Sequence, residues 1–370
     1  MSKIKVLTIF GTRPEAIKMA PVVKEIEKNP DIFENFVCVT AQHRELLDGV
    51  LNLFEITPDF DLNIMKENQN LWSVTSDILL KTKDVTEKVN PDIVLVHGDT
   101  TTSMASALSA FYAKIPVGHV EAGLRTFDKY YPFPEEINRV FTDSISTYHF
   151  APTDKSCENL KQSQIPSKNI YKTGNTVIDA LLYTVKNRQK QVTGLNLNPD
   201  MKTILLTSHR RENFGDPIKN ICKAVLELAE HNKNIEFVYP VHPNPNVRKP
   251  VYELLSGKER IHLTEPLEYA EFCTLMKKSY LILTDSGGVQ EEAPSLGKPV
   301  LVLRNTTERP EAVEYGTVKL TGTNKEKIVS EVQNLLNNKN EYIKMSEAIN
   351  PYGDGFASKR IIDVLKNIKH

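Results

Sequence analysis

The sequence predicts an α/β protein with two doubly wound parallel sheets, and three observations lead to this expectation. Short apolar segments alternate with helix-compatible segments through the first half of the chain, which is the pattern of a parallel sheet covered by helices. A polar stretch of low periodicity, residues 186–202, then interrupts the alternation. The alternation resumes after it, and 370 residues suffice for two domains of ordinary size. We therefore expect two Rossmann-like domains.

The first half opens with an expected strand at residues 4–10, followed by the turn Gly11-Thr12-Arg13-Pro14. Proline suits the first position of a helix, so a helix should run from this turn to about residue 28. The later elements are predicted from their apolar periodicity: strands at 36–40, 93–97, 117–120 and 148–151, and helices at 44–54, 71–89, 101–113 and from about 135.

The second half repeats this organisation. Expected strands lie at residues 203–207, 235–239, 261–263, 281–284 and 300–303, with helices between them, and two further helices are expected at 325–337 and 357–368. We therefore expect a first domain of residues 1–172 and a second domain of residues 173–356.

The stretch LILTDSGGVQEEAPSLGKPVLVL, which begins at Leu281, carries the strongest local signal. It predicts a strand, a tight turn with Ser286, Gly287 and Gly288, and a helix. A helix start offers free backbone N–H groups to an anion, and glycines allow close approach. Glu291 and Glu292 follow within the first turns, and a carboxylate there can accept hydrogen bonds from sugar hydroxyls. The alternative is that Ser286 only caps the helix.

Charge and cysteine content narrow the function classes. The formal net charge is −1, which argues against general attraction to nucleic acid or anionic lipid. The four cysteines are far apart and show no zinc spacing, so we expect reduced thiols in a cytoplasmic protein and no metal. The N-terminal apolar run is too short for a signal peptide, and no window approaches a membrane-spanning length.

Charged side chains follow several expected strands. In open parallel sheets, ligands bind outside the carboxyl ends of the strands, so two domains facing each other would bring these groups together across one cleft. The candidates are Arg13, Asp99, Glu121, His209 with Arg210 and Arg211, and Asp285 with Ser286.

Each candidate also has a purely structural interpretation. Arg13 could pair with a carboxylate, Lys18 could be a solvated helix residue, and Asp99 could cap the helix that begins at residue 101. Glu135 and Glu136 could complement a helix dipole, and His209 could be a satisfied structural histidine. The collection of such groups at one predicted edge favours a functional site.

Missing motifs are also informative. The sequence contains no GxGxxG dinucleotide fingerprint and no GxxxxGK[ST] phosphate loop, so neither a nicotinamide site nor a P-loop is indicated. A diphosphate ligand without a redox cofactor remains the natural occupant.

Nine motifs in order resemble the non-hydrolysing UDP-N-acetylglucosamine 2-epimerases along nearly the whole chain. They are GTRPEAIKMAP, TAQHRELLD, VHGDTTTS, GHVEAGLRT, PFPEEINR, GNTVIDAL, TSHRREN, VHPNP and DSGGVQEEAPSLGKPVLVLR. The resemblance implies a glycosyltransferase-B-like fold, a C-terminal helix (357–370) that packs back on the first domain, and a homodimer. It also implies reversible conversion of UDP-N-acetylglucosamine to UDP-N-acetylmannosamine, with UDP as the leaving group and no cofactor.

The resemblance also assigns roles to residues. Asp99, Glu121, Glu135 and His209 are the implied catalytic groups. The substrate-binding set comprises Arg13, Lys18, Arg139, His209, Phe272, Ser286, Gly287, Gly288, Glu292 and Arg309, of which Arg13, His209, Ser286 and Gly287 hold the diphosphate, Glu292 the ribose and Phe272 the uracil. A second, allosteric site would use Gln42, His43, Arg210 and His242. Relatives often carry an arginine where this chain has Asn68, so we expect that second site to be weakened.

Three other functions remain compatible with the motifs. A glycosyltransferase of the same fold would use the nucleotide site but also need an acceptor. A hydrolysing epimerase would release free N-acetylmannosamine, and a catalytically silent sensor would bind UDP without turnover.

Overall fold

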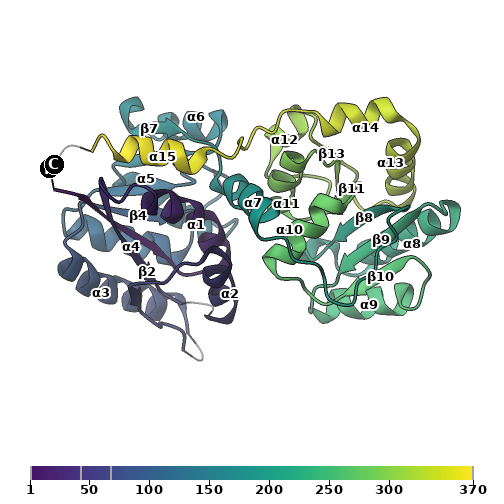
Figure 1. Cartoon of the computed structure of the whole chain (residues 1–370), viewed down its shortest axis with the longest axis horizontal. Coiled ribbons are helices and arrows are strands. Elements are labelled where there is room, and N and C mark those ends of the chain that lie inside the picture. Colours follow the sequence, from purple (N-terminus) through teal and green to yellow (C-terminus); the bar gives the residue numbers. More distant parts are fainter. Residues whose placement is uncertain (1, 42–43, 67–68, 369–370) are drawn as a thin grey trace. The chain divides into compact units, whose positions relative to one another are not determined.

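The computed structural model describes residues 2–41, 44–66 and 69–368, and its chain divides into two compact units (Figure 1). The first consists of Met1–Ala180 and Tyr352–His370, and the second of Leu181–Pro351. These bounds differ from the expected 172/173 and 356/357. Residues 173–180 join the first unit because Val177, Ile178 and Ala180 are buried and the N–H of Asn175 donates to the carbonyl of Tyr352 at 2.6 Å.

The described part of the first unit contains one seven-stranded parallel sheet, with the strand order β3-β2-β1-β4-β5-β6-β7. Its strands are β1 (Ile4–Phe10), β2 (Phe33–Val39), β3 (Phe60–Asp61), β4 (Ile93–His97), β5 (Val117–Val120), β6 (Tyr148–Ala151) and β7 (Ile170–Lys172). The order reverses direction at β1 and β4, so the ends of these two strands flank the switch point where ligands bind in such sheets.

Helices connect these strands and cover the sheet. They are α1 (Arg13–Glu27), α2 (Arg44–Phe54), α3 (Leu71–Val89), α4 (Thr101–Tyr112), α5 (Glu135–Ile145), α6 (Asp154–Gln162), η1 (Ser167–Asn169), α7 (Thr176–Asn187, which continues into the second unit) and α15 (Ala357–Leu365). Central β1 and β4 are almost entirely buried, as expected of a sheet covered on both faces.

The second unit repeats the plan with a six-stranded sheet over its described residues, in the order β10-β9-β8-β11-β12-β13. Its strands are β8 (Lys202–Thr207), β9 (Ile235–Pro240), β10 (Ile261–Thr264), β11 (Leu281–Thr284), β12 (Val300–Val302) and β13 (Val318–Leu320). Here β8 and β11 flank the switch point. The two strands pair in parallel, and their register begins with Leu281 of β11 opposite Ile204 of β8.

The helices of the second unit are mostly those expected from the periodicity. They are η2 (Arg211–Asn213), α8 (Asp216–His231), α9 (Pro245–Leu255), α10 (Tyr269–Lys278), α11 (Gly287–Glu292), η3 (Ala293–Leu296), α12 (Pro310–Glu314), α13 (Lys325–Asn337) and α14 (Lys339–Ser346). The expected helix after the glycine turn is split into α11 and η3, because Pro294 cannot continue an α-helix ladder.

Some strands differ from the sequence prediction in where they begin or in whether they were predicted at all. Strand β2 begins at Phe33 rather than at residue 36, because Phe33 pairs with Ile4 of β1 although polar Glu34 and Asn35 break the apolar run. Strands β3 and β7 were not predicted, since each contains only two or three residues. None of the helices in the described ranges is both long and apolar enough to cross a membrane.

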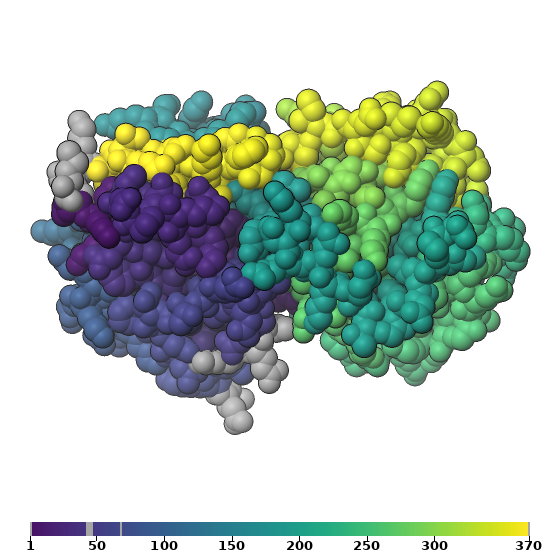
Figure 2. All heavy atoms as spheres, viewed as in Figure 1, coloured from purple at the N-terminus to yellow at the C-terminus, as the bar shows by residue number. Residues whose placement is uncertain are grey.

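The C-terminal helix α15 belongs to the first unit and contacts α1; its yellow atoms lie against the purple atoms of the N-terminal segment in Figure 2. Asp179 of α7 anchors its first turn. The Asp179 carboxylate accepts hydrogen bonds from the N–H groups of Ala357 and Ser358, at 3.2 and 2.8 Å, and from Ser358 Oγ at 2.6 Å. This is the arrangement of a helix N-cap supplied from another helix.

Candidate active site

Two carboxylates stand at the carboxyl edge of the first sheet. Asp99 follows β4 through Gly98, and Glu121 follows β5 directly. Glu121 has φ = 64°, in the left-handed region that is costly for a side chain other than glycine or asparagine. Its side chain is only 7% exposed. The backbone thus turns sharply at the strand end and directs a buried carboxylate toward neighbouring cations.

Glu121 is the centre of a charged cluster. Its Oε2 forms an ion pair with Lys18 of α1 and accepts a hydrogen bond from Asn175 Nδ2 at 3.0 Å. His97 Nε2 lies 3.6 Å from Oε2, and Arg139 Nη1 lies 3.8 Å from Oε1. Burial opposes ionisation, but Lys18, His97 and Arg139 together hold the pKa of Glu121 well below its usual range. Glu121 is therefore ionised at neutral pH.

Asp99 does not cap the helix that follows it. The N-cap of α4 is Thr100, whose side chain accepts from the N–H of Ser103. The Asp99 carboxylate instead pairs with Arg139 of α5, and Asn138 Nδ2 donates to the Asp99 carbonyl at 3.0 Å. Arg139 also donates to the Glu121 carbonyl at 2.7 Å, so one guanidinium connects both strand-end carboxylates.

The two glutamates at the start of α5 have different surroundings. Glu136 accepts hydrogen bonds from the N–H groups of Thr126 and Phe127 at 2.9 and 3.0 Å, so it holds the preceding loop. Glu135 Oε2 is buried and has no hydrogen-bond partner among the described residues. A buried polar atom without a partner is costly, so this oxygen has the capacity to accept a hydrogen bond from a ligand.

Glu15 holds two strand-end loops together. Its Oε2 accepts from the N–H groups of Gly11 and Thr12, at 3.1 and 2.8 Å. Its Oε1 accepts from the hydroxyls of Thr100 and Ser103, at 2.7 and 3.0 Å. The loop before half-buried Arg13 is thereby fixed to the loop that contains Asp99.

A second buried cluster contacts the loop that carries Asp99. Asp143 of α5 accepts from His119 Nδ1 at 2.6 Å and pairs with Arg125 Nη1 at 2.7 Å. His119 Nε2 lies 2.7 Å from the carbonyl oxygen of Gly98, which precedes Asp99. Burial alone would raise the pKa of Asp143, but His119 and Arg125 lower it to about 2. This ionised carboxylate supports the loop that contains the first cluster.

In the second unit, Asp285 organises the end of β8. Its Oδ2 accepts from the N–H groups of His209 and Arg210, at 2.8 and 2.9 Å, and from Ser208 Oγ and Asn213 Nδ2, both at 2.9 Å. His209 Nδ1 lies 2.9 Å from Oδ1. Burial acts against the charge, yet His209 and the amide donors lower the pKa of Asp285. Since a carboxylate only accepts, Nδ1 carries the proton and Asp285 fixes the orientation of the ring.

Two arginines converge on the glycine turn. A Cβ placed on Gly287 would lie 3.5 Å from Arg309 Cζ and 3.8 Å from Arg210 Nη2. Arg309 Nε donates to buried Glu291 at 2.6 Å, which positions its guanidinium. Ser286 makes no side-chain cap bond, so the structural alternative for this residue is not supported. Two guanidinium groups beside a glycine offer N–H donors suited to phosphate oxygens.

Further along the turn, Glu292 is buried and accepts a hydrogen bond from Tyr269 Oη at 3.1 Å. Phe272 lies on the same helix as Tyr269 and is half-buried.

His242 follows β9, and its ring centroid is 5.6 Å from that of His209. Burial and the neighbouring His209 lower the pKa of His242.

Gln42 and His43, which are assigned to the second nucleotide-sugar site, lie outside the described residues, and so does Asn68, which stands where relatives often carry an arginine. Within the described ranges, no group of three or more His, Cys, Asp or Glu side chains could hold a metal ion.

Comparison with known proteins identifies the family. A family model described as UDP-N-acetylglucosamine 2-epimerase matches residues 24–366. The UDP-N-acetylglucosamine 2-epimerase of Salmonella typhimurium is 56% identical, with 99% of both chains covered. The chain belongs to the UDP-N-acetylglucosamine 2-epimerase family. This membership and the two parallel sheets confirm the predicted fold class, two Rossmann-like domains of the glycosyltransferase-B-like type.

Solved structures of UDP-N-acetylglucosamine 2-epimerases agree with this assignment. That of Neisseria meningitidis, bound to UDP-GlcNAc, is 55% identical with a TM-score of 0.88, and the match covers 98% of this chain and 99% of that one. That of Methanocaldococcus jannaschii, in complex with UDP-GlcNAc and UDP, is 37% identical with a TM-score of 0.78, over 98% and 99% of the two chains.

Several residues of the two clusters were not singled out from the sequence. His97 and Asn175 lie within the motifs VHGDTTTS and GNTVIDAL, so motif membership could have flagged them. Glu15 lies within the motif GTRPEAIKMAP and forms a capping box with Thr12, so it could have been flagged as well. Asp143 and Tyr269 gave no signal of their own, because each acts through residues that only the fold brings near.

Proposed function

We propose that this chain interconverts UDP-N-acetylglucosamine and UDP-N-acetylmannosamine by eliminating UDP and adding it back. The observation that supports this most directly is the carboxylate cluster of the first unit. Glu121 is ionised, Asp99 is paired to Arg139, and Glu135 Oε2 has no partner in the described part of the chain. Carboxylates in such different environments can serve as base and acid in one reaction.

In this proposal the second unit holds the nucleotide. The Ser286-Gly287-Gly288 turn binds the diphosphate together with His209 and Arg309. Glu292 binds the ribose and Phe272 lines the uracil. The convergence of guanidinium groups on Gly287 supports the diphosphate assignment, because these cations would also stabilise UDP as a leaving group.

The substrate explains why an elimination is needed. The C2 hydrogen of the sugar is not adjacent to a carbonyl, so direct deprotonation and reprotonation is unfavourable. A carboxylate removes the C2 proton while the bond between C1 and the diphosphate oxygen breaks, which leaves UDP and 2-acetamidoglucal. A second group, which acts as the acid, then delivers a proton to the opposite face of C2 while the diphosphate oxygen bonds to C1 again. Asp99, Glu121 and Glu135 are the candidate proton carriers, surrounded by Lys18 and Arg139.

The mechanism predicts exchange with solvent. Carboxylate protons exchange with water, so product formed in deuterium oxide should carry deuterium at C2, observable by NMR. Oxygen-18 placed in the C1–O–P bridge should move into non-bridging positions if the bound diphosphate rotates before readdition. Full retention of protium at C2 without bridge scrambling would contradict elimination and indicate internal hydride return.

The same proposal predicts independence from added NAD and divalent metal. Its basis is the lack of a nicotinamide fingerprint in the sequence and of a metal-ligand cluster among the described side chains. Turnover of UDP-N-acetylglucosamine should persist after dialysis against EDTA. A loss of activity that only a divalent ion restores would refute this prediction.

Incubation with UDP-N-acetylglucosamine alone also separates the rival functions. Epimerisation yields UDP-N-acetylmannosamine, whereas a hydrolysing enzyme yields free N-acetylmannosamine and UDP. A glycosyltransferase needs an acceptor, and a sensor yields no product. We further propose that the enzyme acts in the cytoplasm as a homodimer and supplies N-acetylmannosamine-type sugars for cell-surface polysaccharide.

A further inference from the structure

Tyr269 makes a buried contact with the carboxylate assigned to the ribose. It is the first residue of α10, and its Oη lies 3.1 Å from Glu292 Oε2. Both residues are 8% exposed. Burial and the adjacent Glu292 raise the pKa of Tyr269 well above its ordinary value, so the phenol remains protonated at neutral pH. The phenol is therefore the donor and the carboxylate the acceptor.

The other oxygen of this carboxylate points toward the glycine turn. Glu292 Oε1 would lie 3.5 Å from a Cβ placed on Gly288, so the missing side chain leaves room beside it. The Tyr269 bond to Oε2 restricts rotation of the carboxylate about its last torsion, which otherwise has a broad preference. A fixed carboxylate presents its oxygens to a ligand at a lower entropic cost than a rotating one.

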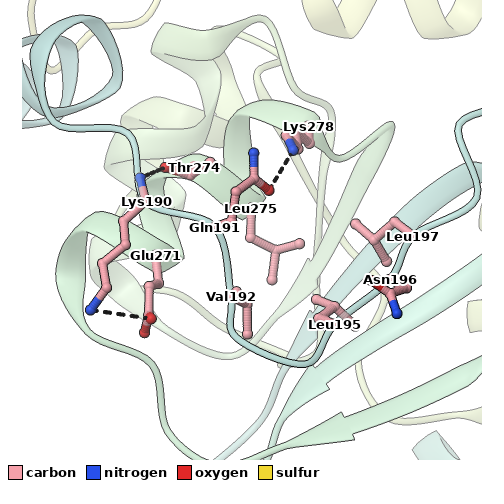
Figure 3. A pocket seen from close by; sticks show the side chains of 10 residues that line it. All are labelled: Lys190, Gln191, Val192, Leu195, Asn196, Leu197, Glu271, Thr274, Leu275 and Lys278. Atoms are coloured by element: carbon pink, nitrogen blue, oxygen red, sulfur yellow. Dashed lines mark hydrogen bonds and ion pairs between the residues drawn. The ribbon is translucent and has the colours of Figure 1, made fainter.

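Tyr269 itself lies on a firmly held helix. The linker between α7 and β8 crosses α10 and bonds to it (Figure 3): the N–H of Lys190 donates to Thr274 Oγ1 at 3.0 Å, and Lys278 Nζ donates to Gln191 Oε1 at 2.7 Å. A capping box of Glu268 and Glu271 closes the first turn, where Tyr269 lies. These bonds hold the helix that carries the phenol.

We propose that Tyr269 is a positioning residue for nucleotide recognition: its hydroxyl orients Glu292 toward the ribose hydroxyls and thereby sets the preference for ribonucleotide over deoxyribonucleotide. This inference rests on the proposed function, in which Glu292 binds the ribose. Tyr269 does not need to touch the nucleotide, because it acts through the Glu292 carboxylate.

The test compares binding of UDP, 2′-deoxy-UDP and 3′-deoxy-UDP by calorimetry. The unmodified chain should bind UDP about tenfold or more tightly than at least one deoxy analogue, the usual scale for a hydrogen bond to a charged group. Tyr269→Phe should weaken UDP by roughly fivefold while leaving that analogue nearly unchanged, so the ratio falls. In turnover, KM for UDP-N-acetylglucosamine should rise with kcat little changed.

Two further variants separate positioning from stability. Tyr342→Phe removes a phenol that donates to the Tyr280 carbonyl at 2.9 Å in the same unit, and it should keep the full ribose preference. Glu292→Gln should lose the preference, and adding Tyr269→Phe to it should change little more, because the two residues act as one unit.

The outcomes are distinguishable. If the unmodified chain prefers UDP and Tyr269→Phe keeps that preference in full, the positioning role is overturned while the ribose assignment stands. If the unmodified chain binds UDP and both deoxy analogues equally, the assignment of Glu292 to the ribose fails and the role of Tyr269 fails with it.

Discussion

Replacing Glu121 with Gln is expected to lower turnover by about 10² or more, the scale typical of a positioned acid or base. Glutamine is nearly isosteric but cannot accept a proton from C2, and it loses the ion pair with Lys18. Asp99→Asn and Glu135→Gln should have effects of similar size, since these residues complete the proposed set of proton carriers. Turnover of UDP-N-acetylglucosamine measured by NMR tests all three.

Glu136→Gln is the matched control for these variants. Glu136 is buried beside Glu135 in the first turn of α5, but both of its oxygens accept backbone N–H groups of the preceding loop. An amide oxygen can replace one of these acceptors, so this variant should keep far more activity than Glu135→Gln. Near-normal turnover in Asp99→Asn, Glu121→Gln and Glu135→Gln alike would refute the assignment of the active site to this edge.

The largest expected effect on stability comes from Asp143→Asn. The change removes a buried carboxylate, leaves the Arg125 guanidinium without its ion-pair partner and takes away the acceptor of the His119 hydrogen bond. Breaking a buried pair in this way typically costs about 3–5 kcal/mol. Hydrogen exchange in increasing urea should show the loss in peptides of the first unit, while peptides of the second unit serve as an internal reference.

Asp154→Asn is the control for that measurement. Asp154 pairs with Lys172 at 2.9 Å on the surface of the same unit, and exposed pairs are typically worth about 0–1 kcal/mol. Equal protection in Asp143→Asn and the unmodified chain would show that the buried cluster is not needed for stability.

The same cluster predicts a pH dependence with a definite sign. The pKa of Asp143 falls from 3.8 to about 2 on folding, so its carboxylate stabilises the folded state above pH 4. This contribution should disappear as the pH falls from about 4 to about 2. The first unit of Asp143→Asn should therefore lose less stability over this range than that of the unmodified chain. An identical acid profile would contradict the role assigned to Asp143.

The sequence by itself determined the class of fold, most element bounds and the family. Strands such as β1, β4 and β11 are buried on both faces, so they appear as continuous apolar runs, and helices such as α3 show their period over many residues. The turn at Ser286 and the acids after β4 and β5 were also recognisable, because in a parallel sheet the strand end alone predicts where ligands lie.

Only the tertiary structure decided which partners some of these residues have. Asp99 looks like a helix cap in the sequence, but Thr100 takes that position and Asp99 pairs with Arg139, 40 positions away. Lys18 looks like a solvated helix residue, but strand register and helix packing bring it to Glu121, 103 positions away. Contacts at such separations leave no periodic or local trace in the sequence, because they depend on where whole strands and helices pack. The limits of the two units were hidden for the same reason. The edge strands β3 and β7 were missed because they are too short to show a periodic pattern.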